Sequence, residues 1–211
     1  MYNLMLTIRN DFDRFYDRVS AVKYSKETFV KYLSLFRGSH DSDLTRAVVF
    51  YIVKRMSRGG LCERFSWSNR IYSTGPAEEH CWNTALINLG VVHNRLQSVI
   101  LMNRNAFDIL GDYLGQPDCF IYLDPPYLIS TRVLKKAYDH EFSLENHRRL
   151  ASMLNSATAK IMLSGYESPE YAEWFSGWTR HVKDVGNHSS QHNKLKIRKQ
   201  EILWANYTPS I

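Results

Sequence analysis

The second half of the chain alternates short apolar segments with helical ones, and this alternation limits the folds open to it. Continuous apolar runs at residues 98–102, 119–123 and 160–166 are typical of strands buried on both faces of a sheet. Two more strands are expected at 180–185 and 201–205. Helices are expected at 144–155, where Ser143 is a suitable N-cap, and from Pro169 at a first helical position to about Phe175.

Strands separated by helices favour a mainly parallel, doubly wound α/β sheet. Such sheets bind ligands where their strands end at the carboxyl edge. That edge would bring together Asn105, residues 124–127 and residues 164–166.

The first half is predicted to be helical. Apolar residues recur at helical spacing from Tyr2 to about Phe36, with a break near residues 23–25, and further helices are expected at 44–56 (buried) and 82–96. Between these two lies an irregular stretch, residues 57–76, in which aromatic residues alternate with arginines. The 211 residues suit one ordinary domain.

Composition excludes several classes of protein. With 44% hydrophobic and 23% charged residues the chain is globular, and it contains neither a run of about eighteen apolar residues for a bilayer nor a signal-peptide pattern at its start. Its three cysteines (Cys62, Cys81, Cys119) are too far apart for a disulfide framework or a Cys-x-x-Cys site, and they suit a reducing cytosol. No metal site is expected, because His188 has no second ligand at a useful spacing.

The net charge of +6 comes from two clusters. Residues 45–70 carry six Arg or Lys against one Glu, and residues 181–200 carry five against one Asp. The remainder of the chain is net negative. Clustered positive charge is what a polyanion partner requires, since basic side chains displace the counterions of phosphates. A solvated basic surface would show the same charge count.

The sequence Asp124-Pro125-Pro126-Tyr127 follows an apolar strand directly. Two consecutive prolines make a stiff turn without N–H donors, so the Pro125 carbonyl and the Asp124 carboxylate both remain free to accept hydrogen bonds. Two acceptors beside an aromatic ring suit an exocyclic amine on a planar base. Drawing both amine hydrogens toward these acceptors would favour a pyramidal nitrogen and free its lone pair for an incoming methyl group. A strand end stopped by prolines is the simpler interpretation of the same four residues.

The chain resembles the adenine-N6 DNA methyltransferases of the Dam type along nearly its whole length. The motif at 124–127 is the centre of this resemblance, and further similar segments occur in the same order as in that family. They are Phe50-Tyr51-Ile52 with Gly59-Gly60-Leu61-Cys62, residues 103–107, residues 160–166, Asn187-His188-Ser189-Ser190, and residues 198–204.

The resemblance implies a Rossmann-like methyltransferase sheet and methyl transfer from S-adenosylmethionine to N6 of an adenine flipped out of double-stranded DNA. It assigns catalysis to Asp124, Pro125, Pro126 and Tyr127, and cofactor binding to Asn105, Ala106, Phe107 and Asp124. Nucleic-acid contacts would come from Arg58, Arg64, Arg70, Asn187, His188, Lys194, Arg198 and Lys199. Residues 37–96 would form the target-recognition region and residues 97–211 the catalytic α/β part of a single methyltransferase domain. The implied location is the cytoplasm of a bacterium or a phage-infected cell, at the nucleoid, with no membrane partner.

The chain departs from the family in its cofactor loop. The family has a Phe-x-Gly-x-Gly loop after its first strand, whereas this sequence contains no Gly-x-Gly. The first two strands of the sheet are therefore expected to be missing, either encoded on a separate chain that supplies the loop or lost by truncation. Asn105 stands where the family usually has Asp.

Two alternatives remain open beside methyl transfer to adenine. The chain would be a non-catalytic DNA-binding remnant if the cofactor loop is absent altogether. A methyltransferase acting on RNA or on N4 of cytosine is less favoured, because the related cytosine enzymes favour Ser over Asp at the first position of the motif.

Overall fold

The structure is a computed structural model that describes residues 1–72, 75–131, 141–185 and 199–208. Contacts divide the chain into two compact units, Met1–Asn103 and Arg104–Ile211, and each is described by itself. None of the helices in the described ranges is long and apolar enough to cross a membrane.

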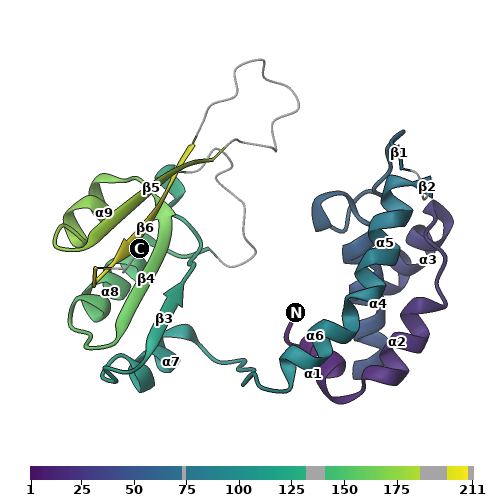
Figure 1. Ribbon diagram of the computed structural model, residues 1–211, viewed down its shortest axis with the longest axis horizontal. Coiled ribbons are helices and arrows are strands. Elements are labelled where there is room, and N and C mark those ends of the chain that lie inside the picture. Colours follow the sequence, from purple (N-terminus) through teal and green to yellow (C-terminus); the bar gives the residue numbers. More distant parts are fainter. Residues whose placement is uncertain (73–74, 132–140, 186–198, 209–211) are drawn as a thin grey trace. The chain divides into compact units, whose positions relative to one another are not determined.

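The first unit is a bundle of helices around one buried helix (Figure 1). Its centre is α4 (Asp43–Met56), which has eight buried residues and packs against α1, α2 and α3. The outer helices are α1 (Tyr2–Asn10), α2 (Phe12–Ser20), α3 (Lys26–Phe36), α5 (Ala77–Ile87) and α6 (Leu89–Leu96). The prediction of a buried helix at 44–56 is confirmed. The segment up to Phe36 has a further break at Asp11, whose φ of −139° leaves the helical region, and the helix expected at 82–96 begins earlier and divides at Asn88.

The irregular stretch after α4 folds into a braced loop and a short hairpin. The loop starts with a 3₁₀ turn, η1 (Arg58–Gly60), and the hairpin pairs β1 (Ile71–Tyr72) with β2 (Gly75–Pro76) in antiparallel fashion. Lys54 Nζ donates to the Gly60 carbonyl at 2.8 Å. Gly60 has a φ of 70°, a backbone conformation that glycine adopts at no steric cost.

The second unit is a mixed sheet with helices. Its strands β3 (Phe120–Leu123), β4 (Lys160–Tyr166), β5 (Thr179–Val185) and β6 (Lys199–Ala205) stand in the order β3-β4-β6-β5. Its helices are α7 (Ala106–Tyr113), η2 (Ile129–Thr131), α8 (Leu144–Asn155) and α9 (Pro169–Trp174). As predicted, Ser143 caps α8, where its hydroxyl accepts from Asn146 N at 3.1 Å, and Pro169 opens α9.

The α/β class is confirmed, but the expectation of a mainly parallel sheet is wrong for the described strands. Only β3 and β4 run parallel, whereas β6 is antiparallel to both β4 and β5. The composition of β5 agrees with this arrangement. Its sequence, Thr-Arg-His-Val-Lys-Asp-Val, is largely polar, unlike the continuous apolar runs of buried parallel strands.

The strand expected at 98–102 does not form. Val99 and Leu101 instead pack against the apolar core of the helical unit, and Arg9 Nη1 donates to the Val99 carbonyl at 3.1 Å. Packing on the helices accounts for Val99 and Leu101, whereas Ile100 is 78% exposed and Met102 is also exposed. The following residues, 103–107, are consequently the entry to α7 and not a strand end.

Close packing of β4 against β6 depends on Gly165. The buried side chains of Ile161, Leu163 and Trp204 belong to the core beneath the sheet. A Cβ atom added at Gly165 would lie 3.1 Å from Trp204 Cζ3 and 3.5 Å from Tyr171 Cε1. Trp204 is 1% exposed and has little room to withdraw.

We predict that Gly165→Ala lowers the free energy of unfolding by about 1–3 kcal/mol, because overpacking forces neighbouring side chains from their preferred positions. Urea denaturation followed by tryptophan fluorescence measures the loss. Gly177→Ala is the matched control, since nothing lies within 4 Å of a Cβ added there. Equal stability of the two variants would contradict the packing role of Gly165.

Candidate active site and nucleic-acid contacts

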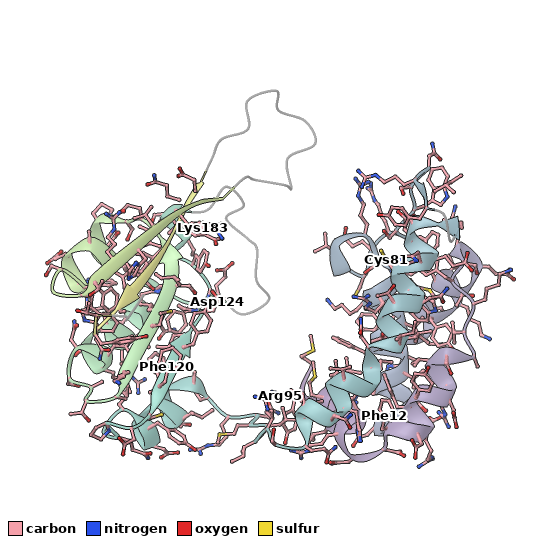
Figure 2. All side chains as sticks on the ribbon, in the orientation of Figure 1. Phe12, Cys81, Arg95, Phe120, Asp124 and Lys183 are labelled. Atoms are coloured by element: carbon pink, nitrogen blue, oxygen red, sulfur yellow. The ribbon has the colours of Figure 1, made fainter. Side chains whose placement is uncertain are left out.

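Asp124 is fixed at the carboxyl end of β3 by the neighbouring strand. Figure 2 shows Asp124 and Phe120 at opposite ends of this strand. The hydroxyl of Ser164 in β4 lies 2.8 Å from Asp124 Oδ1 and 3.1 Å from the Leu123 carbonyl oxygen. Ser164 is 6% exposed, whereas Asp124 is exposed. The structure therefore holds one side of the carboxylate and leaves it acceptor capacity toward solvent.

The two prolines lead from Asp124 into an anchored turn. Pro125 and Pro126 are half-buried and lack N–H groups, so this stretch offers acceptors without competing donors. Beyond the motif, Leu128 is buried in the core of the second unit, and its carbonyl accepts from Thr131 N at 3.0 Å. The motif is consequently held on one side by β3 and on the other by the buried Leu128.

Tyr127 turns back toward the same carboxylate. Its ring meets that of Tyr166 edge to face, with centroids 4.6 Å apart. Burial, followed by the nearby charge of Asp124, raises the pKa of the Tyr127 phenol well above its usual value, although a hydrogen bond with Ser164 acts the other way. The charge of Glu201 on β6 raises this pKa further. The phenol is therefore neutral at physiological pH and adds no negative charge to that of Asp124.

The predicted cofactor residues 105–107 begin α7. Asn105 Oδ1 accepts from Phe107 N at 2.9 Å, which makes Asn105 the N-cap of the helix, and Ala106 is exposed. The ring of Phe107 stacks on Phe142 with centroids 5.8 Å apart, and the Arg149 guanidinium lies 4.3 Å from its centroid. The amide oxygen of Asn105 is thus engaged in capping, and its NH₂ group is not part of that bond.

The three predicted DNA-contacting arginines occupy one exposed segment of the first unit. Arg58 and Arg64 are exposed and are joined by a backbone hydrogen bond of 2.8 Å from Arg58 N to Arg64 O. Arg70 is exposed just before β1. The side chain of Trp67, 71% exposed, lies between Arg64 and Arg70 in sequence. Rigid backbone and exposed cationic side chains are what phosphate contacts require.

A groove of about 870 Å³ lies beside Arg64, between the start of α3 and residues 63–68. Aromatic side chains line it, and both charge signs occur around it. The lining includes Tyr24, Phe29, Phe65, Trp67, Lys26, Arg64, Glu63, Glu78 and Glu79.

Most of the second predicted DNA-contacting set lies outside the described residues, namely Asn187, His188, Lys194 and Arg198. Lys199 opens β6, and its backbone pairs with that of Val185. Lys183 on β5 is exposed and is a described member of the same basic cluster. No group of three or more His, Cys, Asp or Glu that could hold a metal ion occurs in the described part of the chain.

The sequence places Ser164 at the carboxyl edge of the sheet, as the structure confirms, but does not assign it to the site. A serine inside the apolar run Ile-Met-Leu-Ser is the available signal. The sequence does not show that Ser164 contacts Asp124, because this contact depends on the register of β3 and β4. Glu201 gives no such signal in the sequence. It comes beside the site only because β6, which follows much later in the chain, pairs with β4 and sets Glu201 opposite Tyr166.

Comparison with known proteins assigns the chain to a family. Comparison with curated protein sequences gave no match. A family model described as D12 class N6 adenine-specific DNA methyltransferase matches residues 1–189. The match covers most of the 211 residues and includes the motif at 124–127. The chain belongs to the D12 class of N6 adenine-specific DNA methyltransferases.

Proposed function

We propose that this chain transfers a methyl group from S-adenosylmethionine to N6 of adenine in double-stranded DNA. One observation carries the proposal beyond family membership. The Asp124-Pro-Pro-Tyr turn stands at the carboxyl end of β3, and the buried hydroxyl of Ser164 contacts the Asp124 carboxylate at 2.8 Å. An acceptor held in this way is preorganised for a hydrogen bond that strengthens during the reaction.

In this mechanism the target amine donates one hydrogen to the Asp124 carboxylate and the other to the Pro125 carbonyl, while Tyr127 stacks on the base. Both hydrogen bonds weaken the delocalisation of the nitrogen lone pair into the ring. The freed lone pair would form the bond to the methyl carbon of the donor while the methyl–sulfur bond of its sulfonium breaks and leaves the electron pair on sulfur. The surplus proton of N6 would leave to solvent by way of the Asp124 carboxylate. The adenine has to leave the base stack first, because an amine inside the duplex cannot meet these acceptors.

Only part of a donor-binding site is present among the described residues. Residues 105–107 and Asp124 are proposed to contact S-adenosylmethionine, with the Asn105 side chain close to its adenine. The capping bond of the Asn105 oxygen leaves the amide NH₂ group as the available donor. The sequence has no Gly-x-Gly with which a backbone could approach the methionine moiety.

A separate chain that supplies the Phe-x-Gly-x-Gly segment would complete this site. The free edge of β3 supports that proposal: β3 stands at the end of the order β3-β4-β6-β5 among the described strands. Phe120 and Tyr122, which share one face of β3, are each 55% exposed. An apolar edge strand with exposed aromatic side chains is suited to pair with a further strand.

Residues 37–96 are proposed as the target-recognition region and residues 97–211 as the catalytic part of one methyltransferase domain that works at the nucleoid in the cytoplasm. Arg58, Arg64 and Arg70 would contact DNA in the first region, and Asn187, His188, Lys194, Arg198 and Lys199 would hold the strand around the flipped base. The exposed ring of Trp67 lies in the same segment as the arginines and suits stacking on a base.

The second candidate function is DNA binding without catalysis. It is favoured by the lack of Gly-x-Gly and by the engagement of the Asn105 oxygen as a helix cap. The two functions differ in their response to a companion chain, since only the catalytic one gains methyl transfer when the cofactor loop is supplied.

The first prediction concerns DNA affinity. The chain should bind duplex DNA with an affinity that falls steeply as salt rises, and Arg58→Ala, Arg64→Ala and Arg70→Ala together should lower both the affinity and the salt slope. Each lost phosphate contact removes about 0.9 from the slope of log affinity against log salt. Fluorescence anisotropy with a labelled duplex measures both quantities.

The control is a variant with equal loss of charge, Arg14→Ala, Arg18→Ala and Arg95→Ala, on α2 and α6, outside the segment that carries the three arginines. It should leave the salt slope nearly unchanged. The same change of slope in both variants would refute a specific role for the three arginines.

The second prediction concerns the methyl donor. Isothermal titration calorimetry of the chain alone should show no saturable binding of S-adenosylmethionine, because the backbone approach of a Gly-x-Gly loop is missing from its sequence. Addition of a polypeptide with the Phe-x-Gly-x-Gly segment should restore binding. Micromolar binding by the chain alone would overturn the proposal of a companion chain.

The third prediction concerns Asp124. In the enzyme reconstituted with the cofactor loop, Asp124→Ala should lower methyl transfer about a hundred- to a thousandfold, the usual effect of removing one preorganised hydrogen-bond partner of a transition state. Transfer of a tritiated methyl group to duplex DNA measures it, and DNA affinity should not change. Asp118→Ala, at an exposed position just before β3, is the control. Retained turnover in Asp124→Ala would refute the role given to its carboxylate.

A further inference from the structure

We infer that Ser164 is a positioning residue, which orients the Asp124 carboxylate for the amine of the target base. The inference rests on the proposed function and adds to it a residue that the motif does not contain. It starts from the contact of 2.8 Å between Ser164 Oγ and Asp124 Oδ1.

The register of the two parallel strands brings these side chains together. Leu123 of β3 pairs with Leu163 of β4, so the next residues along the chain, Asp124 and Ser164, occupy equivalent positions. Equivalent positions in neighbouring strands present their side chains to the same face of a sheet. β4 is paired on its other side with β6, where Ser164 stands opposite Leu203. Strands on both sides therefore fix the backbone that carries the hydroxyl.

The environment of the hydroxyl makes the contact directional. Ser164 is 6% exposed, so water does not compete freely for its single proton. It contacts Asp124 Oδ1 at 2.8 Å and the Leu123 carbonyl at 3.1 Å, which belong to consecutive residues of the same strand end, and it also forms a hydrogen bond with the Tyr127 phenol. The shorter contact has the charged acceptor, and hydrogen bonds to charged groups are the stronger ones.

This contact limits the orientations that the Asp124 carboxylate can adopt. An exposed aspartate without such a partner would exchange between side-chain rotamers. With Oδ1 held by Ser164 and a further hydrogen bond to the Tyr127 phenol, the rotation of the carboxylate is limited. Because Asp124 is exposed, its carboxylate keeps acceptor capacity for an incoming N–H. The amine then meets an acceptor whose direction is already set.

Three variants separate positioning from general stability. Ser164→Ala removes the hydroxyl, and Ser164→Thr restores it. Ser168→Ala is the matched control, because Ser168 is also buried, at 3% exposure, and its hydroxyl accepts from Tyr171 N at 3.1 Å in the cap of α9. Its loss removes a buried serine hydrogen bond elsewhere in the same unit.

The first readout needs no ligand. Nuclear magnetic resonance of the full chain gives the Hα–Hβ couplings of Asp124, which report its χ1 rotamer. We expect one dominant rotamer in the wild type, Ser164→Thr and Ser168→Ala, and averaged couplings in Ser164→Ala. Couplings in Ser164→Ala that match the wild type would overturn the inference, whatever the function of the chain.

The second readout tests the amine itself. Deoxyadenosine and purine 2′-deoxyriboside, which lacks the exocyclic amine, are titrated separately onto each variant. The wild type should prefer deoxyadenosine, and Ser164→Ala should lose roughly fivefold of that preference, the usual size of one hydrogen bond. An unchanged preference in Ser164→Ala would overturn the inference. A wild type without preference would count against the proposed function, while the couplings of Asp124 would still decide whether Ser164 orients it.

Discussion

The parallel register of β3 and β4 is the constraint on which the rest of the candidate site depends. It sets Leu123 beside Leu163, and the next residue of each strand, Asp124 or Ser164, is polar. A slip by one residue would turn Ser164 to the opposite face of the sheet and remove the partner of Asp124. The prolines and Tyr127 follow from the same point, since the direction in which the chain leaves β3 decides where their carbonyls and ring lie.

Because side chains alternate between the two faces of β4, one residue packs against the core and the residue before it contacts the carboxylate. Gly165 faces Trp204 and Tyr171, where a single additional carbon would approach the indole to 3.1 Å. Ser164, one residue earlier, faces the other way and contacts the carboxylate. Tight packing on one face thus keeps the hydroxyl on the other face in a fixed position, which is how a core residue without any contact to the site affects its geometry.

Local patterns predicted most elements but not how they pair. The buried helix α4, the strands β3 and β4, and the Ser143 cap are all visible in residue order, because each depends on neighbours along the chain. The prediction of a strand at 98–102 is wrong, because Val99 and Leu101 of this apolar run pack on the helical core instead of joining the sheet. The antiparallel insertion of β6 and the contact between Ser164 and Asp124 join residues about forty positions apart, and no periodicity records such a pairing. The turn at residues 124–127 is predictable because strand, turn and acceptors are contiguous in sequence, whereas its contact with Ser164 is not.

The charges around the turn at residues 124–127 fit the base extrusion that we propose. Asp124 and Glu201 place negative charge around Tyr127, which is unfavourable beside a phosphate backbone but favourable beside an amine. The exposed arginines stand in another part of the sequence, at 58, 64 and 70. In the proposed function, the exposed arginines would contact phosphates, and the extruded base would meet the acceptors at residues 124 and 125.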